Sequence, residues 1–386
     1  MKKLNIAVIF GSRSTEHDIS IVTAISSIIK PLEISGKYNV VPVYIDKQGK
    51  WFTDPKLKQI SLYSSGQIEA FLAKRQPLKL RMDGKLELIS GGLVKTKSIV
   101  IDVAFPATHG THGEDGELMG LLEMAGVAYV GCPMPAAVIA MDKALAKTLA
   151  ANASILTPKY VWFYAHDFEA DRSAILSRIA ALRYPLFVKP VHLGSSIAIN
   201  KVENAKELIN AIEVAAHYDD KILVEEGVEN LIEVTLPIIG NETPKAALLE
   251  QPLLNKTDAV FDFDSKYLSG AKKGKSAKTN AQGYSKLPAD LPKALYKRAE
   301  QMALEVYRIF GCAGIARVDL LIDSKTEAVY FNEVNPLPGS LYAHNWRQAG
   351  LSNVQLVEEL IRLALERDAS KQKLATSFSS NYLKQY

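Results

Sequence analysis

The chain has 386 residues, of which 48% are apolar and 23% are charged, and its formal net charge at pH 7 is +4. This apolar content excludes a disordered chain, and the length predicts two or three domains, each with its own core. So small a net charge argues against nucleic-acid binding by the whole protein.

The cysteines and the apolar runs indicate where the protein works. Cys132 and Cys312 belong to no close-spaced metal or redox pair, which is typical of reduced thiols in the cytosol, and Cys312 is predicted to pack at a helix end. The apolar segment at residues 4–10 is too short for a signal sequence, and no apolar run approaches the roughly 18 residues that cross a bilayer. We therefore predict a cytoplasmic protein with no membrane partner.

The first third of the chain alternates strand-like apolar runs with helical patterns. Strands are predicted at residues 4–10, 40–45 and 99–105, and helices at residues 19–29 and 118–125. This alternation is typical of βαβ units around a parallel sheet. It predicts an α/β domain over residues 1–139.

A small α/β module is predicted next, over residues 140–230. Its elements, in chain order, are a helix at 141–151, strands at 186–189 and 197–202, a helix at 205–216 and a strand at 222–225.

The third predicted domain covers residues 231–368. Strands are expected at 232–239, 315–322 and 328–333, and a final helix at 354–365. Between them lies a long amphipathic helix with one apolar face, formed by Leu295, Ala299, Met302, Val306 and Phe310. The polar segment 369–386 is predicted to be a loose tail.

Three familiar patterns are incomplete. The turn at 11–14 lacks the later glycines of a dinucleotide site, and the P-loop-like stretch 270–276 is one residue short and joins no strand to a helix. His109 and His112 lie near Glu114 at a spacing that a zinc helix could use, but Gly110 and Gly113 predict a loop. These patterns therefore favour neither a Rossmann cofactor, a Walker site nor zinc.

Two lysines could hold a polyphosphate from different elements. Lys189 ends the apolar run 186–189, and Lys143 begins the helix predicted at 141–151. The short turn Gly194-Ser195-Ser196 could wrap phosphate oxygens with its backbone N–H groups and hydroxyls. The alternatives are solvated lysines and an ordinary turn.

Polar side chains also lie along two consecutive predicted strands. Strand alternation places Arg317 and Asp319 on one face, and Glu333 and Asn335 on one face. Two carboxylates and an amide oxygen suit one or two Mg²⁺ ions that bridge phosphates. A structural ion pair between Arg317 and Asp319 is the alternative for those two residues alone. It does not account for the other two, which lead into a rigid Pro/Gly turn at 336–339.

Taken together in chain order, these segments resemble the D-alanine–D-alanine ligase family of ATP-grasp enzymes. The segments that carry the resemblance are residues 11–20, 109–116, 141–143, 187–190, 194–196, 266–267, 316–319 and 332–335. Each is weak alone, whereas eight in order are specific, and the resemblance spans residues 4–367.

The resemblance implies a three-domain ATP-grasp fold, in which a parallel-sheet domain precedes two domains that clamp ATP. It implies an ATP-dependent carboxylate–amine ligase that activates one amino acid as an acyl phosphate, which the amine of a second amino acid attacks. Two D-alanines for peptidoglycan precursors would be the substrates, and the enzyme would be a homodimer. A ligase for other amino acids or peptides, and an inactive nucleotide-binding regulatory protein, stay open as alternatives.

The resemblance also implies roles for individual residues. ATP would be bound by Lys143, Lys189, Ser195, Ser196, Glu225, Glu226, Val228 and Lys266, with Glu225 at the adenine. Two Mg²⁺ or Mn²⁺ ions would be held by Asp319, Glu333 and Asn335.

The amino-acid substrates would be held by a further set. Glu16, Ser195 and Tyr267 would form a hydrogen-bonded group that orients the first substrate, close to His109 and Glu114. Arg317 and the backbone N–H of Gly339 would stabilise the tetrahedral oxyanion. Ser340 and Leu341 would bind the carboxylate of the second substrate.

The sequence departs from the family pattern at four places. Leu231 stands where an acid for the ribose is expected, so that Glu229 or Asn230 would have to replace it, and Ala198 stands where glycine is usual. The predicted lid, residues 269–286, is longer and more basic than usual. The turn after Asn335 lacks the usual threonine, and the loop that follows it is short.

Overall fold

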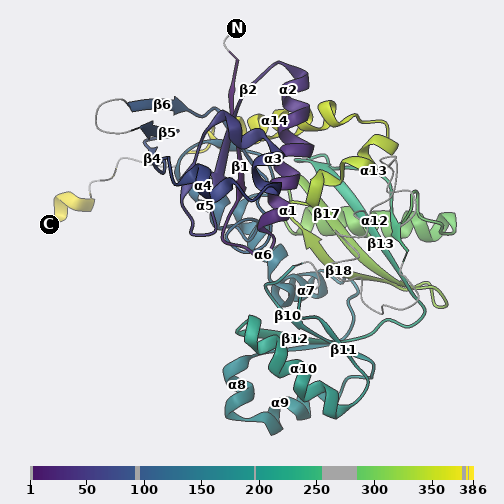
Figure 1. Ribbon diagram of the computed structural model, residues 1–386. Coiled ribbons are helices and arrows are strands. Elements are labelled where there is room, and N and C mark those ends of the chain that lie inside the picture. Colours follow the sequence, from purple (N-terminus) through teal and green to yellow (C-terminus); the bar gives the residue numbers. More distant parts are fainter. Residues whose placement is uncertain (1–2, 92–95, 195–196, 254–284, 376–379, 381) are drawn as a thin grey trace.

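The computed structural model describes residues 3–91, 96–194, 197–253, 285–375, 380 and 382–386. Three sheets of four or five strands succeed one another along the chain, and Figure 1 shows the middle one in a lobe that projects below the other two. None of the helices within these ranges is long and apolar enough to span a membrane.

The first sheet has the strand order β3-β2-β1-β7-β8. Its strands are β1 (Asn5–Gly11), β2 (Asn39–Ile45), β3 (Trp51–Phe52), β7 (Val103–Pro106) and β8 (Ala128–Tyr129). β1 runs parallel to β2 and β7, β7 runs parallel to β8, and only the edge strand β3 is antiparallel. The residues of β1 from Ile6 to Phe10 are fully buried, as expected for a strand that is covered on both faces. The predicted parallel sheet is confirmed.

The strand predicted at 99–105 is wrong, because the chain forms two strands there. β6 (Thr96–Val100) belongs to an antiparallel sheet with β5 (Leu86–Gly91) and β4 (Lys79–Met82), and β7 belongs to the main sheet. Between them Asp102 accepts a hydrogen bond from the backbone N–H of Asn5 at 2.7 Å, which turns the chain from one sheet into the other.

The helix predicted at 19–29 is the middle of a longer one. α1 (His17–Val22) continues into a π-helical segment, η1 (Thr23–Ile29), and then into α2 (Lys30–Ser35), which ends at Gly36 with φ of 65°. A π-helical segment inside an α-helix often marks a functional position. The other helical elements of this part are η2 (Pro55–Lys58), α3 (Ile60–Ser64), α4 (Ile68–Leu72) and α5 (Glu117–Met124).

The middle sheet is antiparallel, with the order β11-β10-β12-β9. It contains β9 (Tyr160–Tyr164), β10 (Leu186–Pro190), β11 (Asn200–Val202) and β12 (Lys221–Glu226), and shares a core with α8 (Ala165–Ala170), α9 (Arg172–Ile179) and α10 (Ala205–Tyr218). The strand predicted at 197–202 begins only at Asn200, because Ala198 adopts a left-handed turn conformation with φ of 56°.

Two helices separate this sheet from the first one. The predicted helix 141–151 is instead α6 (Met134–Met141) followed by α7 (Lys143–Asn152). Asp142 leaves the helical conformation between them, and its carboxylate accepts hydrogen bonds from the N–H groups of Ala144 and Leu145. This is an N-cap, so Lys143 is the first residue of α7.

The third sheet is also antiparallel, with the order β14-β13-β17-β18. Its strands are β13 (Leu231–Gly240), β14 (Lys245–Ala246), β17 (Gly314–Asp323) and β18 (Val329–Asn335), and α12 (Lys293–Ile309) shares its core. β15 (Gln251–Pro252) pairs with β16 (Ser285–Lys286), and most of the predicted lid, up to residue 284, lies outside the described residues.

The C-terminal helices return to the N-terminal sheet. After η3 (Gly339–Tyr342) and α13 (Ala343–Gln348), α14 (Asn353–Lys371) runs three residues past the predicted end of the domain, and η4 (Tyr382–Gln385) lies near the end of the tail. Leu360 and Ile361 of α14 share one core with Ile6 and Val8 of β1. Figure 1 shows α14 lying beside α2. The first and last parts of the chain are therefore packed as one body.

Candidate active site

The polar residues predicted on two strands lie together on one sheet face. In the β17–β18 pair, Arg317 is opposite Asn335 and Asp319 is opposite Glu333. Beyond this point the register shifts by one residue, since Leu320 is opposite Phe331, which leaves Asn332 as a bulge. A bulge restarts the alternation of a strand, and here it lets Glu333 and Asn335 face the open side while Phe331 stays buried.

A bidentate ion pair joins two of these residues. Arg317 donates from Nε and from a terminal nitrogen to the two carboxylate oxygens of Asp319, at 2.7 and 2.5 Å, and the Asn335 amide donates to the same carboxylate at 3.1 Å. Burial alone would lower the pKa of Arg317, but the charges of Asp319 and Glu333 outweigh burial and raise it. The structural ion pair considered from the sequence is thus present, and Glu333 lies outside it.

Lys143 reaches this face from the start of α7. Its Nζ donates to the Leu193 carbonyl at 2.6 Å and lies 3.9 Å from a carboxylate oxygen of Glu333. The lysine is 8% exposed. A buried cation therefore stands between the backbone that leads into the predicted phosphate turn and an acid of the third sheet.

Lys189 belongs to a buried group of three charges. Glu225 forms ion pairs with Lys189 and with Lys147, the latter at 2.7 Å, and both Glu225 and Lys147 have side chains that are at most 2% exposed. Burial alone would raise the pKa of Glu225, but the two ammonium groups lower it to about 2. Burial and Lys189 lower the pKa of Lys147, although Glu225 opposes them.

Sequence reasoning missed Lys147, Glu233 and Thr23. Lys147 follows Lys143 by four residues, so it lies one turn along the same helix face, and this spacing was the available signal. Glu233 on β13 is near enough to Lys189 to raise its pKa. The available signal for Glu233 was the alternation of side chains along β13, which places it on the opposite face from buried Val234.

The other residues of β12 and its loop that are predicted to bind ATP have different surroundings. Glu226 accepts hydrogen bonds from Arg183, from the backbone at 3.1 Å and from the side chain at 3.0 Å, on the opposite side of the strand from Glu225. Val228 follows the strand and is half-buried. Near the unusual Leu231, the Asn230 amide donates to Asp323 at 3.3 Å.

Two buried acids mark the predicted first-substrate side. Glu16 and Glu114 are 4% and 6% exposed. A Cβ added to Gly110 or Gly194 would lie 3.0 or 3.2 Å from a carboxylate oxygen of Glu16, so both backbones pass directly against it. Burial and the charge of Glu16 raise the pKa of Glu114 well above its ordinary value. Glu16 therefore lies where the N-terminal loop meets the predicted phosphate turn.

His109 is held as a neutral imidazole. Burial lowers its pKa to about 4, and its Nε2 lies 3.0 Å from the hydroxyl of Thr23. The same hydroxyl accepts a hydrogen bond from the Ser340 N–H at 3.0 Å. The Ser340 N–H is therefore directed into the protein, and binding of the second substrate by Ser340 stays a prediction.

The turn at Ser340 has an unusual backbone. Ser340, Leu341 and Tyr342 have φ values of 51°, 55° and 51°, so three consecutive residues other than glycine adopt the left-handed conformation. Each such residue costs roughly 1–2 kcal/mol. Leu341 is fully buried, Ser340 is exposed, and the Tyr342 ring lies 5.0 Å from the Arg317 guanidinium.

Several other predicted site residues lie outside the described part of the chain. Ser195, Ser196, Lys266 and Tyr267, and the lid up to residue 284, lie outside the described residues. The flanks of the phosphate turn are described, and the Ile197 N–H donates to the Gly194 carbonyl at 3.1 Å. Gly339 opens η3, directly before the left-handed turn.

His109 and His112, the pair considered for zinc, face different surroundings. His112 pairs with Glu117 at 2.5 Å on the surface, whereas His109 is buried against Thr23.

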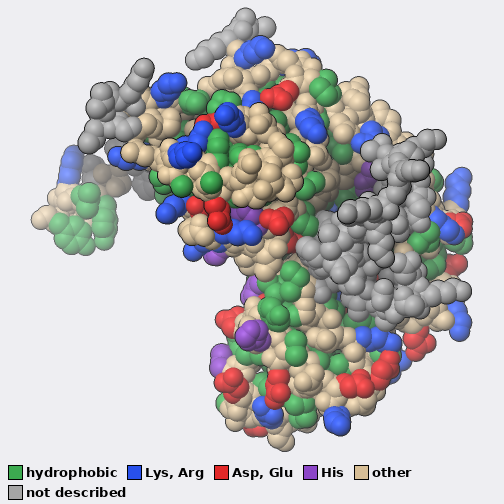
Figure 2. Space-filling model, viewed as in Figure 1, with side chains coloured by type: hydrophobic (Ala, Val, Ile, Leu, Met, Phe, Trp, Pro, Cys, Tyr) green, Lys and Arg blue, Asp and Glu red, His purple; other side chains and the backbone are tan. Residues whose placement is uncertain are grey.

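Figure 2 shows acidic and basic side chains intermingled over the lower lobe. On the visible, described part of that lobe, neither positive nor negative side chains form an extended patch.

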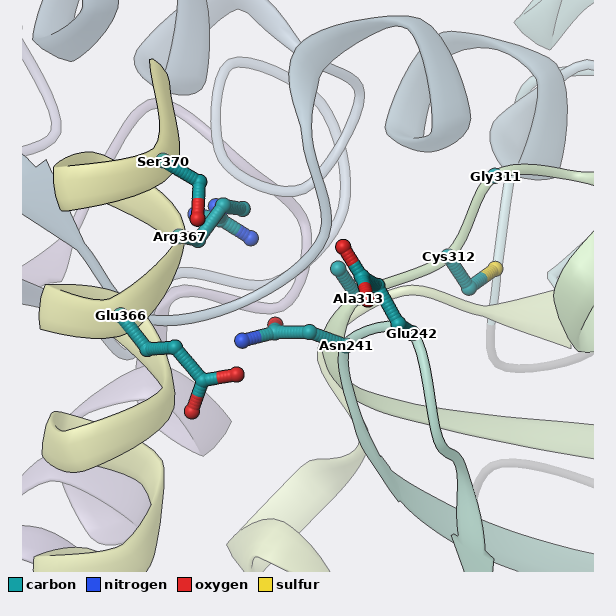
Figure 3. A pocket seen from close by; sticks show the side chains of 8 residues that line it. All are labelled: Asn241, Glu242, Gly311, Cys312, Ala313, Glu366, Arg367 and Ser370. Atoms are coloured by element: carbon teal, nitrogen blue, oxygen red, sulfur yellow. The ribbon is translucent and has the colours of Figure 1, made fainter. Parts of the chain in front are cut away.

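A cavity of about 250 Å³ lies away from this face, between α14 and the turns after β13 and α12 (Figure 3). Arg367 lines it, but its guanidinium donates to the carbonyls of Tyr129 and Gly131. Cys312 also lines it and hydrogen bonds to the buried Cys132 thiol, which lowers the pKa of Cys132. The cavity includes none of the predicted site residues.

Comparison with known proteins identifies relatives along most of the chain. Residues 5–132 match the family model of the D-Ala–D-Ala ligase N-terminus, and residues 149–362 match that of its C-terminus. The D-alanine–D-alanine ligase of Chloroherpeton thalassium is 36% identical over 95% of this chain and 98% of its own length. That of Caldicellulosiruptor bescii is 35% identical over 98% and 99%.

Solved structures agree with the sequence matches. The D-alanine–D-alanine ligase from Coxiella burnetii has a TM-score of 0.78 at 28% identity and covers 97% of both chains. The VanG D-Ala:D-Ser ligase from Enterococcus faecalis has a TM-score of 0.73 at 29% identity and covers 94% of this chain and all of its own. With matches over both ends and nearly the full length, the chain belongs to the D-alanine–D-alanine ligase family.

Proposed function

We propose that the protein joins two molecules of D-alanine at the expense of ATP, releasing ADP and phosphate. The observation that carries this proposal is the meeting of Lys143 with the Arg317, Asp319, Glu333 and Asn335 face, since it combines a phosphate-binding cation with an oxyanion stabiliser and oxygen ligands. Matches to D-alanine–D-alanine ligases over 95% or more of the chain support the choice of substrate.

ATP binds between the middle and third sheets in this proposal. Lys143 and Lys189 pair with its phosphate oxygens, and the backbone of residues 193–196 adds N–H donors. The ion pairs of the two lysines support these roles. Lys143 is already paired with Glu333, and Lys189, which is 11% exposed, is already paired with Glu225, so phosphate would replace one anion by another.

Asp319, Glu333 and Asn335 would hold one or two Mg²⁺ or Mn²⁺ ions. They offer two carboxylates and one amide on paired strands, and hard oxygen donors of this kind suit these ions. The Asn335 amide now donates to Asp319, so its carbonyl oxygen would be the ligand atom. When bound, the metal neutralises charge on the phosphates.

Two displacements complete the reaction. A carboxylate oxygen of the first D-alanine attacks the γ-phosphorus and ADP leaves. The amine of the second D-alanine then attacks the acyl carbon, loses a proton and expels phosphate. Arg317 stays charged while paired with Asp319, so it can stabilise the oxyanion together with the N–H of Gly339. Glu16, His109 and Glu114 surround the first substrate, and Leu341 with Ser340 lies on the side of the second.

Several expectations remain predictions of this proposal. The protein would be a cytoplasmic homodimer, with domains at 1–139, 140–230 and 231–368. Cell fractionation measures the location, and sedimentation velocity measures the oligomeric state. Limited proteolysis near residues 139 and 230 tests the domain boundaries.

A product assay tests the proposal. The purified protein is incubated with ATP, Mg²⁺ and D-alanine, L-alanine or D-serine, alone and in pairs, and both ADP and dipeptide are measured by mass spectrometry. We expect one D-alanyl-D-alanine per ADP and the highest kcat/KM for D-alanine. ADP release without dipeptide from any pair would reject the ligase.

A further inference from the structure

One hydroxyl connects the N-terminal helix, the His109 loop and the left-handed turn. Thr23 is fully buried, and its Oγ1 is 3.0 Å from His109 Nε2 and 3.0 Å from the Ser340 nitrogen. It is the first residue of the π-helical segment and lies seven residues after Glu16, the N-cap of the same continuous helix.

The chemistry of the partners fixes the direction of each hydrogen bond. The Ser340 N–H can only donate, so Oγ1 accepts it and the hydroxyl hydrogen is free to donate to His109. A hydrogen bond to the backbone of Leu337 raises the pKa of His109. A backbone group has this effect only as an acceptor, so the ring donates an N–H to the Leu337 carbonyl. The neutral ring therefore carries its proton on Nδ1, and Nε2 accepts from Thr23.

The left-handed turn depends on such outside contacts. Three L-residues in a row do not adopt this conformation by preference. Within the turn, the Leu341 N–H donates to the Pro338 carbonyl at 2.9 Å. Outside it, the Leu341 side chain is buried in the N-terminal core, and the Ser340 N–H is bound by Thr23.

We propose that Thr23 is a positioning residue, whose hydroxyl holds the His109 ring and the Ser340–Tyr342 backbone in one arrangement and so sets the second amino-acid site relative to the first. The inference rests on the proposed ligase function. It assigns Thr23 no contact with substrate. Its effect passes through the backbone turn that carries Ser340 and through Tyr342, which lies beside Arg317.

Steady-state kinetics of Thr23→Val and Thr23→Ser test the proposal. Valine keeps the shape but lacks the hydroxyl, and serine restores it. The rate is measured against D-alanine over a range that resolves the two amino-acid constants, and separately against ATP. For Thr23→Val we expect KM for the second D-alanine to rise about tenfold, the size expected from one lost hydrogen bond. KM for ATP and for the first D-alanine should change less than twofold, and Thr23→Ser should behave as the wild type.

An equal rise of all three constants in Thr23→Val, or no rise, would overturn the proposal. A second measurement does not need turnover. In protein labelled with ¹⁵N-histidine, the His109 signal, assigned from its loss in His109→Asn, should show an unprotonated Nε2 from pH 6 to 8. That nitrogen should shift in Thr23→Val and return in Thr23→Ser.

An unchanged His109 signal in Thr23→Val would also overturn the role of Thr23. If the wild type ligates no amino-acid pair, the proposed function fails, and the histidine spectrum still decides whether Thr23 holds the ring. Thr23→Ala replaces Thr23→Val in both measurements if the valine variant does not fold, which a thermal melt shows.

Discussion

Lys147 explains how Lys189 can serve a phosphate although it is paired in the structure. Glu225 contacts both ammonium groups, and the side chains of Glu225 and Lys147 are at most 2% exposed, whereas that of Lys189 is 11% exposed. A buried carboxylate that lost every cation would be costly. Because Lys147 remains beside Glu225, Lys189 can turn toward ATP without leaving that charge unpaired.

This arrangement predicts the behaviour of Lys147→Met. Glu225 would then keep Lys189 as its one ion-pair partner among the described residues, so KM for ATP should rise about tenfold or more while KM for D-alanine changes little. Stability should fall on the order of 1–3 kcal/mol, because a buried hydrogen-bonded charge loses a partner. Initial rates and urea unfolding measure the two effects.

Lys206→Met is the matched control for Lys147→Met. Lys206 lies exposed on α10, which packs on the same sheet, so neither quantity should change. If Lys147→Met unfolds more easily but binds ATP as the wild type does, Lys147 supports the fold alone and the exchange of partners by Lys189 is wrong.

Four charged side chains in contact with one another stabilise the start of helix α7. His192 pairs with Asp219 at 2.9 Å and lies 3.4 Å from Asp142, the N-cap of α7, which also pairs with Lys221 at 2.7 Å. Hydrogen bonds to the two carboxylates raise the pKa of His192 to about 9. The same helix start presents Lys143.

The raised pKa predicts a loss of stability at alkaline pH. Because the folded pKa lies above the ordinary value of 6.5, His192 stabilises the fold fully below pH 6.5 and loses this effect as pH rises to about 9. His192→Asn should therefore lower the melting temperature at pH 6 and approach the wild type above pH 9. Differential scanning fluorimetry at several pH values measures this.

His166→Asn provides the comparison for His192→Asn. His166 is 75% exposed beside Asp167, so its loss should leave the melting temperature nearly unchanged across the same range. A His192→Asn curve that stays parallel to the wild type from pH 6 to 9 would contradict the charged bridge.

Element positions followed from the sequence where apolar periodicity was long, as in β1, β13 and α12. Single polar or small residues caused the errors. Asp102 divides one apolar run into strands of two sheets, Asp142 divides one helical pattern, and Ala198 takes a left-handed turn where a strand was expected. The contact of Asp102 with Asn5 spans 97 residues, so no local pattern contains it. The Asp142 cap is local, and the residue type of Asp142 was the available signal.

Part of the site was predictable because it depends on the alternation of side chains along single strands. Alternation placed Arg317 with Asp319 and Glu333 with Asn335, and the register confirms that these pairs face each other. The left-handed turn at Ser340 and the bridge from Thr23 were not predictable, because Thr23 lies 317 residues from its partner in the chain.

At the scale of the whole molecule, the two ends of the chain share one core. Leu360 is fully buried with residues of β1, whereas Leu365 on the same helix is 37% exposed. Leu360→Ala should destabilise the N-terminal sheet by about 2–5 kcal/mol, because it leaves a cavity in that core. Hydrogen exchange of the β1 and β2 amides measures the loss.

Leu365→Ala removes a similar side chain from the exposed face of α14 and should cost well under 1 kcal/mol. If the β1 amides of Leu360→Ala exchange as slowly as those of the wild type, α14 is not part of the N-terminal core in solution.

The central claim is that the face of Arg317, Asp319, Glu333 and Asn335, with Lys143, activates a carboxylate by transferring phosphate to it. D-alanine with ¹⁸O in both carboxylate oxygens tests this most directly, by mass spectrometry of the phosphate released during turnover with ATP. We predict one ¹⁸O atom in each phosphate from labelled D-alanine, because the acyl-phosphate oxygen leaves with the phosphorus when the amine attacks. Dipeptide formation with unlabelled phosphate, or with ¹⁸O in AMP, would contradict the account.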